Sequence, residues 1–224
     1  MALNPALADA HYDLGLAYLS LWRYREAAES LQACVKIEPR RALAHLLLGR
    51  AYHNSSQNLP AIAAFQQALR LDPNLPLAHY HLGFAYKARG DYDRALREFD
   101  AEIKRDPKAH LAYLAKGQIL FDRGDYAGAR VGFEQVLARQ PGLQEARLGL
   151  ARADLRLGNT SAALDALRQL VADNPSLIAA HYELGRALQK QGDTAGAQKH
   201  LAIFRQLSEE RRKKEAGGMA SQQP

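Results

Sequence analysis

The chain of 224 residues is long enough for one or two globular domains, and its composition is that of a folded protein, with 47% hydrophobic and 24% charged residues. The net charge of +6 is spread along the chain without a dense basic stripe, which argues against nucleic-acid binding. No apolar run reaches the roughly 18 residues that a membrane-spanning helix needs. The single cysteine, Cys34, excludes an internal disulfide.

Residues 1–7 precede a regular pattern that fills most of the chain. Leu3-Asn4-Pro5 aligns with Leu71-Asp72-Pro73, which closes the second half of a later unit. We therefore interpret residues 1–7 as the remnant of a preceding repeat. On this interpretation the chain is a fragment of a longer protein, or its assigned start is too late.

A 34-residue pattern then recurs without insertion or deletion. The position of Gly49 is occupied by Gly or Ala in every other unit, and alanine and proline positions recur at the same interval. A fixed period of this size is typical of a solenoid, in which each unit packs only on its neighbours. We expect one elongated domain of residues 8–211, with the repeats 8–41, 42–75, 76–109, 110–143, 144–177 and 178–211.

Each repeat is predicted to form two helices joined by a tight turn. In the third repeat, the apolar spacing predicts helices from about Leu77 to Arg89 and from about Tyr92 to Arg105. Gly90 suits a left-handed helix end, and the aspartate after it can cap the second helix. The second repeat has Ser55-Ser56 in this turn. In the first repeat Trp22 replaces the glycine, so we expect that turn to differ.

Two antiparallel helices can approach closely only where small residues lie at the crossing. The Gly/Ala position of the first helix and the recurring alanine of the second helix meet this need. With them, the pattern Leu48-Gly49-x-x-Tyr52, Ala61-x-x-x-Phe65 and Pro73 resembles the tetratricopeptide repeat (TPR), from Ala8 to about Arg211. The resemblance implies an all-α fold, a right-handed superhelical solenoid of antiparallel helix pairs whose first helices line a concave groove for peptides or helices.

The last repeat lacks the closing proline. Its second helix is therefore expected to continue through Phe204 and Leu207 into a charged stretch that ends at Glu215. We interpret residues 212–224 as this charged helix end followed by a disordered tail from Ala216. Both ends of the solenoid should expose apolar edges, which would allow weak self-association.

The sequence contains no group of residues suited to catalysis or metal binding. Histidines recur at one repeat position, but equivalent atoms in neighbouring repeats lie about 8–10 Å or more apart, too far for a shared zinc ion. The serines and aspartates of the turns are explained by helix capping. We expect no catalytic residue, no metal and no cofactor, and we interpret Cys34 as a buried, unreactive thiol.

Two charged residues occupy predicted core positions, Lys116 in place of a leucine and Asp154 in place of a tyrosine. A buried charge is costly unless it is paired. We expect Asp154 to take a cationic partner, with Lys116 as first choice and Arg147 as second. The alternative is that either side chain reaches water.

A second stripe along the first helices faces the groove implied by the resemblance. The stripe is apolar in the middle and basic in its C-terminal half, which suits a peptide or helix with apolar anchors and an acidic segment. Chaperone-binding members of the family use Lys and Asn at defined groove positions, where this chain has Leu16 and Arg50, and this argues against chaperone tails as ligands. The predicted groove residues are Arg50, His53, Leu77, Tyr80, Phe84, Lys87, Leu111, Gln118, Phe121, Arg152, Arg156, Arg186 and Lys190.

We interpret the protein as a non-enzymatic scaffold with a protein or peptide ligand, no nucleic acid and no membrane span. One alternative is a substrate-recruiting or regulatory TPR segment of a larger enzyme, such as a glycosyltransferase. Another is an envelope-assembly TPR protein that is missing its targeting segment. The first residues do not resemble a signal peptide, which leaves the compartment open, with the cytoplasm as the working expectation.

Overall fold

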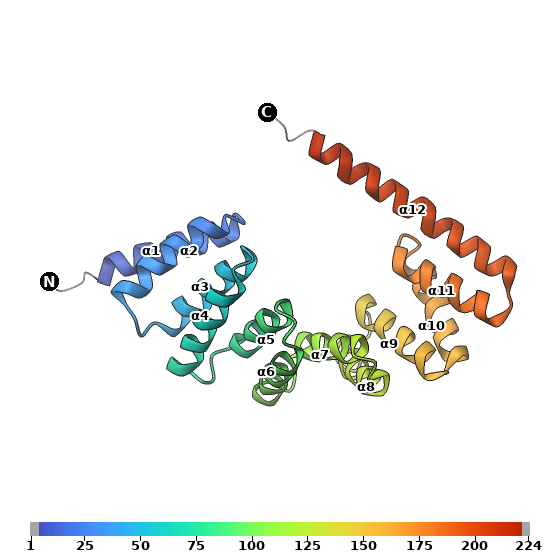
Figure 1. The fold of residues 1–224 in the computed structure, drawn as a ribbon, viewed down its shortest axis with the longest axis horizontal. Helices are drawn as coiled ribbons and strands as arrows, with labels where there is room; N and C mark the ends of the chain where they lie inside the picture. The colour runs from blue at the N-terminus through green and yellow to red at the C-terminus, as the bar shows by residue number, and fades with distance from the viewer. Residues whose placement is uncertain (1–4, 221–224) are drawn as a thin grey trace. The chain divides into compact units, whose positions relative to one another are not determined.

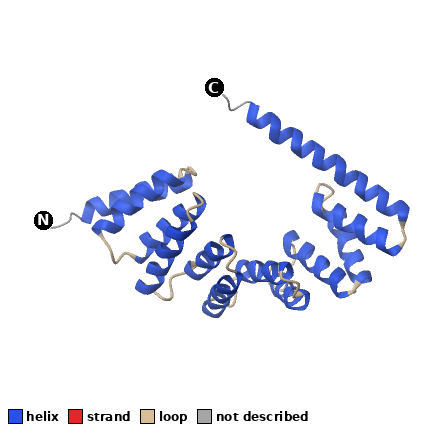
Figure 2. Ribbon diagram, viewed as in Figure 1, coloured by secondary structure: helices blue, strands red, loops and turns tan. Residues whose placement is uncertain are grey.

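The computed structural model describes residues 5–220, and the regular structure of these residues is entirely α-helical (Figures 1 and 2). The helices follow one another in pairs, one pair in each expected repeat, so the predicted all-α solenoid of TPR helix pairs is confirmed. Their bounds are α1 Pro5–Ser20, α2 Tyr24–Ile37, α3 Ala42–Asn54, α4 Asn58–Leu71, α5 Ala78–Ala88, α6 Tyr92–Arg105, α7 His110–Asp122, α8 Tyr126–Leu137, α9 Gln144–Leu157, α10 Thr160–Asp173, α11 Ile178–Gln191 and α12 Thr194–Ala220.

The chain divides into two units, residues 1–112 and residues 113–224, and each is described by itself. In the first, every helix from α1 to α6 packs on the next, and α3 also contacts α1 and α5. In the second, α8 to α12 pack in the same sequential way, and α9 also contacts α11. The division lies within α7, between residues 112 and 113, and the expected single domain of residues 8–211 stays a prediction. Such a division is natural in a repeat array, because each repeat contacts only its neighbours.

The turns within the six helix pairs share one backbone conformation. A residue with positive φ lies at the same repeat position in each of them, namely Trp22 (62°), Ser56 (63°), Gly90 (76°), Gly124 (84°), Gly158 (88°) and Gly192 (92°). The expectation that the turn at Trp22 would differ is therefore wrong. The packing of the two helices sets the direction of the connecting chain, and this overrides the steric preference of a single residue.

Each helix pair crosses at a small residue covered by a large one. A Cβ atom added to Gly83 would lie 2.8 Å from the Phe99 ring, and one added to Gly49 would lie 2.5 Å from the Phe65 ring. The recurring alanine of the second helix is fully buried at Ala61 and its equivalents in the second to fifth repeats. The predicted role of these small residues follows directly from this contact.

At the N-terminal end of the described residues, α1 begins at Pro5, so residues 5–7 form its first turn. The interpretation of residues 1–7 as the remnant of a preceding repeat stays a prediction. Proline is well suited to a first helical turn, where its missing N–H has no intrahelical partner to lose. At the other end, α12 continues to Ala220 instead of ending at Glu215. Helix formation is cooperative, and adding residues to an existing helix costs little. Residues 1–4 and 221–224, with the rest of the proposed tail, lie outside the described residues.

Asp154 is buried and has a cationic partner, but not the one that we expected. The Nε atom of Arg130 and the Nδ2 atom of Asn159 both donate to Asp154 Oδ1, at 3.0 and 2.9 Å. Arg147 instead pairs with Asp173 at 2.6 Å, and Lys116 is half-buried. Arg130 comes from α8, the second helix of its repeat, whereas both expected partners lie on first helices, α7 and α9.

Other sequence-based expectations concern isolated residues. Cys34 is buried, and burial raises the pKa of its thiol. The Nε2 atoms of His45 and His181 each hydrogen-bond a proline carbonyl, as structural histidines do.

Within residues 5–220, no three His, Cys, Asp or Glu side chains are grouped to hold a metal ion. None of the helices found there is both long and apolar enough to cross a membrane. Leu7 is exposed on α1, and the expected self-association stays a prediction.

We predict that Ser56→Gly and Trp22→Gly each raise the free energy of unfolding by about 0.5–1 kcal/mol, because glycine removes the steric cost of the left-handed conformation. Urea denaturation followed by circular dichroism measures the change. Gly90→Ala at the equivalent position is the control and should lower stability. Unchanged or lower denaturation midpoints for both glycine variants would contradict the prediction.

We also predict that Gly83→Ala destabilises the fold by about 1–3 kcal/mol, since its methyl group overlaps the Phe99 ring. Phe99→Leu should relieve this overlap, because the equivalent pair in the fifth repeat is Ala151 with Leu167. In a double-mutant cycle, Gly83→Ala should therefore cost less in the Phe99→Leu background. An equal cost in both backgrounds would show that the overlap is not the cause.

Candidate functional site

The predicted groove residues fall in both units of the chain. The first unit holds Arg50, His53, Leu77, Tyr80, Phe84, Lys87 and Leu111, and the second holds Gln118, Phe121, Arg152, Arg156, Arg186 and Lys190. Each set is described by itself, and a groove that continues through both stays a prediction.

In the first unit, the predicted groove aromatics extend the hydrophobic core. The Tyr80 and Phe84 rings have centroids 4.8 Å apart, and both contact the Phe99 ring, at 6.2 and 5.4 Å. Both side chains are half-buried. Leu77 and Leu111, by contrast, are 46% and 42% exposed. The leucines are thus the more accessible apolar residues of this set.

His81 lies beside this aromatic cluster. Its ring stacks on Phe65 with centroids 5.8 Å apart and meets the Tyr80 ring edge at 5.3 Å. The pKa of His81 is lowered to about 4, chiefly by burial and to a smaller extent by the nearby charges of Arg50 and His53. The imidazole is therefore neutral at pH 7 and packs as an aromatic ring.

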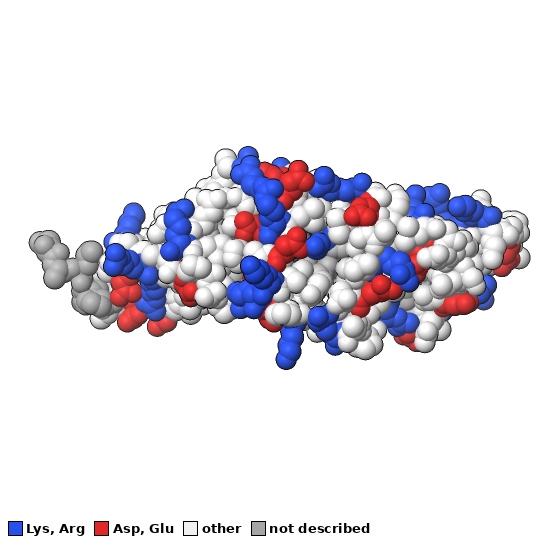
Figure 3. All heavy atoms as spheres, turned by 90° about the horizontal axis from the view of Figure 1, so that it is seen from below, with Lys and Arg blue, Asp and Glu red and all other residues white. Residues whose placement is uncertain are grey.

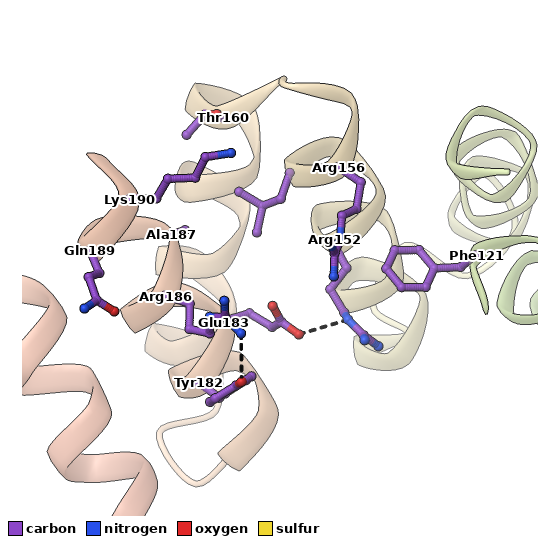
Figure 4. Close-up of a pocket in the computed structure, with 11 residues that line it drawn as sticks. Phe121, Arg152, Arg156, Thr160, Tyr182, Glu183, Arg186, Ala187, Gln189 and Lys190 are labelled. Atoms are coloured by element: carbon purple, nitrogen blue, oxygen red, sulfur yellow. Dashed lines mark hydrogen bonds and ion pairs between the residues drawn. The ribbon is translucent and has the colours of Figure 1, made fainter. Parts of the chain in front are cut away.

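In the second unit, five of the predicted residues line one open pocket of about 660 Å³ (Figure 4). Helices α9 and α11 supply most of its walls, α7 supplies Phe121, and Thr160 lies at the start of α10. The lining residues are Phe121, Arg152, Leu155, Arg156, Thr160, Tyr182, Glu183, Arg186, Ala187, Gln189 and Lys190. Gln118 is not among them, and its Nε2 atom donates to Glu145 at 2.5 Å.

The pocket is strongly basic. Its charged lining residues are three arginines and Lys190 against one carboxylate, Glu183. That carboxylate pairs with Arg152, whose Nε atom lies 3.0 Å from Glu183 Oε1 (Figure 4). Elsewhere the charges are mixed, and Figure 3 shows Lys and Arg interspersed with Asp and Glu over the face that it draws. The pocket therefore carries an excess of positive charge, and such a surface attracts anions.

The three pocket arginines each lie over an aromatic ring. The Arg152 Cζ atom is 4.7 Å from the Phe121 centroid, Arg156 is 5.8 Å from Tyr126, and Arg186 is 5.8 Å from Tyr182. The Nη1 atom of Arg186 also donates to the Tyr182 hydroxyl at 3.1 Å, which raises the pKa of Arg186. The rings hold the guanidinium groups by cation–π contact.

Six of the residues that line the pocket were not among the predicted groove residues. Tyr182, Leu155 and Gln189 lie on the first-helix stripe, so the helical spacing was the signal that could have identified them. Glu183 follows Tyr182, off this stripe, and its role depends on reaching Arg152 on the neighbouring first helix. Such a contact between repeats has no local sequence signal.

Comparison with known families agrees with the helix pairs. Models described as tetratricopeptide repeat match residues 8–41, 80–144, 120–177 and 178–202, and a model described as TPR repeat matches residues 60–90. The chain belongs to the tetratricopeptide repeat family. A TPR protein of this kind is a scaffold for protein interactions, because stacked repeats present extended surfaces.

Several solved TPR structures share the fold. MamA (residues 41 to end) from Desulfovibrio magneticus RS-1 has a TM-score of 0.71 and 24% identity, over 75% of this chain and 96% of that chain. YrrB has a TM-score of 0.69 and 17% identity, over 80% and 93%. PilW has a TM-score of 0.75 and 22% identity, over 87% and 90%. No curated protein sequence matches the chain significantly. These likenesses establish the TPR fold.

We predict that this TPR protein loses stability as the pH falls from about 6.5 towards about 4. In this window the unfolded chain binds a proton at His81 and the folded chain does not, so acid favours unfolding. Burial and the neighbouring His181 also lower the pKa of His200, so it adds to the effect. Thermal midpoints measured between pH 7.5 and pH 4.5 should fall less in His81→Phe than in the wild type. A variant with the same pH dependence as the wild type would contradict the assignment to His81.

Proposed function

We propose that the protein binds an acidic segment of a protein or peptide partner in the pocket between α9 and α11. The observation that carries this proposal is the gathering of three arginines and Lys190 around one carboxylate, beside the Phe121 ring. Coulombic attraction would draw an acidic chain to this surface, and the attraction would weaken as salt is added. Arginine and aromatic residues are also the types that most often dominate binding energy.

The pocket also offers apolar contacts. Phe121 and Leu155 are half-buried lining residues, so each has contact area left for a ligand side chain. A peptide with an apolar residue beside a run of acidic ones would satisfy both features. This is the ligand that the first-helix stripe suggests.

The similar structures support a binding function at a coarse level. YrrB is described as a TPR protein with an unusual peptide-binding site, which is consistent with peptide binding on this fold. PilW is described as a type IV pilus biogenesis factor, which keeps assembly at the cell envelope as a second candidate. At sequence identities of 17% and 22%, the likeness shows that the fold is shared, but it does not indicate the binding partner of this chain. We therefore rest the proposal on the pocket itself.

Charge reversal tests this function. A fluorescein-labelled peptide with a leucine beside a run of glutamates should bind the wild type at low salt, and its glutamine counterpart should bind weakly. Arg152→Glu with Arg186→Glu should weaken binding of the acidic peptide by about a hundredfold, because attraction at two contacts becomes repulsion. Fluorescence anisotropy measures the dissociation constants.

Arg168→Glu provides the matched control. Arg168 is an exposed arginine of α10 that pairs with Asp165 and does not line the pocket. This variant changes the net charge by the same amount per substitution but should leave affinity within about twofold. If the double reversal binds the acidic peptide as tightly as the wild type, the proposed site is wrong.

A further inference from the structure

The arginines of the pocket are held in a way that a simple basic patch does not need. Arg152 comes from α9 and lies over a ring of α7, and Arg156, one turn later, lies over Tyr126 at the start of α8. Arg186 lies over Tyr182 of its own helix. Each guanidinium group therefore lies near a ring supplied by the same unit of the fold, and Figure 4 draws Arg152 with Phe121 and Arg186 with Tyr182.

This arrangement favours one kind of anion contact. An arginine side chain normally loses rotamer freedom when it binds a ligand, and a ring that already holds the guanidinium reduces this loss. The ring contacts one face of the guanidinium plane, whereas the N–H donors point outward along its edges. An arginine held in this way can form two parallel hydrogen bonds to one carboxylate, which lysine cannot do.

Glu183 shows the chemistry of the anion that this geometry accepts. Its carboxylate already occupies the Nε edge of Arg152 at 3.0 Å, while Arg152 remains on the Phe121 ring. The Arg152 side chain is 43% exposed and that of Glu183 is 20% exposed, so Arg152 is the more accessible partner of this pair. The anion that pairs with Arg152 in the free protein is thus a carboxylate, and it contacts the Nε atom.

We propose that the pocket reads the carboxylates of its ligand through the planar forks of Arg152, Arg156 and Arg186, and that Phe121, Tyr126 and Tyr182 are positioning residues that fix these forks. This inference rests on the proposed function and deepens it. On this inference, the affinity for the ligand depends on the orientation of the guanidinium groups as well as on their positive charge. It also changes the expected role of Phe121, which supports Arg152 in addition to offering apolar contact.

Charge-conserving variants separate geometry from charge. Arg152→Lys with Arg186→Lys keeps both positive charges but removes both forks. We expect this variant to bind the leucine–glutamate peptide about tenfold or more weakly than the wild type, because each fork loses a bidentate contact. Arg168→Lys, outside the pocket, is the matched control.

The role of the ring is tested by a matched pair at Phe121. Phe121→Tyr keeps an aromatic face under Arg152 and should bind the peptide like the wild type. Phe121→Leu keeps apolar bulk but removes the face, and should weaken binding severalfold. Far-UV circular dichroism and the thermal midpoint check that both variants fold. If Phe121→Leu does not fold, the Arg152→Lys with Arg186→Lys variant still tests whether the arginine forks contribute to affinity.

The outcomes distinguish this inference from the proposed function. If charge reversal abolishes binding but the double lysine variant binds within about twofold of the wild type, the pocket binds acidic peptides by charge alone and the inference is overturned. Equal affinities of Phe121→Leu and Phe121→Tyr would overturn the positioning role of the ring. A peptide with phosphoserines in place of glutamates is the last arm, and tighter binding of that peptide would overturn the assignment to carboxylates.

Discussion

The close crossing of two helices at a small residue is the contact on which the rest of this structure depends. At Gly83 the Phe99 ring lies where a Cβ atom would be, and the same pairing recurs at Gly49 with Phe65. A close approach of this kind lets a large side chain cover the neighbouring backbone and exclude water from it. The left-handed residue in each turn follows from the same requirement, because the connecting chain must reverse within a few residues.

Packing between neighbours determines where a ligand can bind. The second helices bury their recurring alanine and large residue in the crossing, as at Ala95 and Phe99. The first helices contact each other only through part of their surface, so α9 and α11 keep one face accessible. Side chains on that face are released from core packing and can carry charge without the desolvation cost of burial. The pocket arginines occupy this face.

Much of the fold could be predicted from the sequence because its causes are local and repeated. The bounds of α6, Tyr92–Arg105, follow from a turn glycine, a capping aspartate and a following proline. The conformation of Trp22 could not be predicted, because its positive φ is imposed by helix packing against the preference of the residue. The Arg130 partner of Asp154 was missed for a related reason, since it depends on contact between helices of adjacent repeats.

In the pocket as well, the sequence pattern predicted which residues share a helix face but not which side chains are in contact. Helical spacing identified Arg152, Arg186 and Phe121 as residues of one face, but a stripe says nothing about which side chains touch. The stacking of Arg152 on Phe121 and its pairing with Glu183 each join residues of adjacent repeats. A repeat sequence specifies the positions at which such contacts can form, and the residues that vary between repeats decide which contacts do form. The proposed ligand preference therefore depends on the residues that vary between repeats, which lie on the backbone geometry that the repeats share.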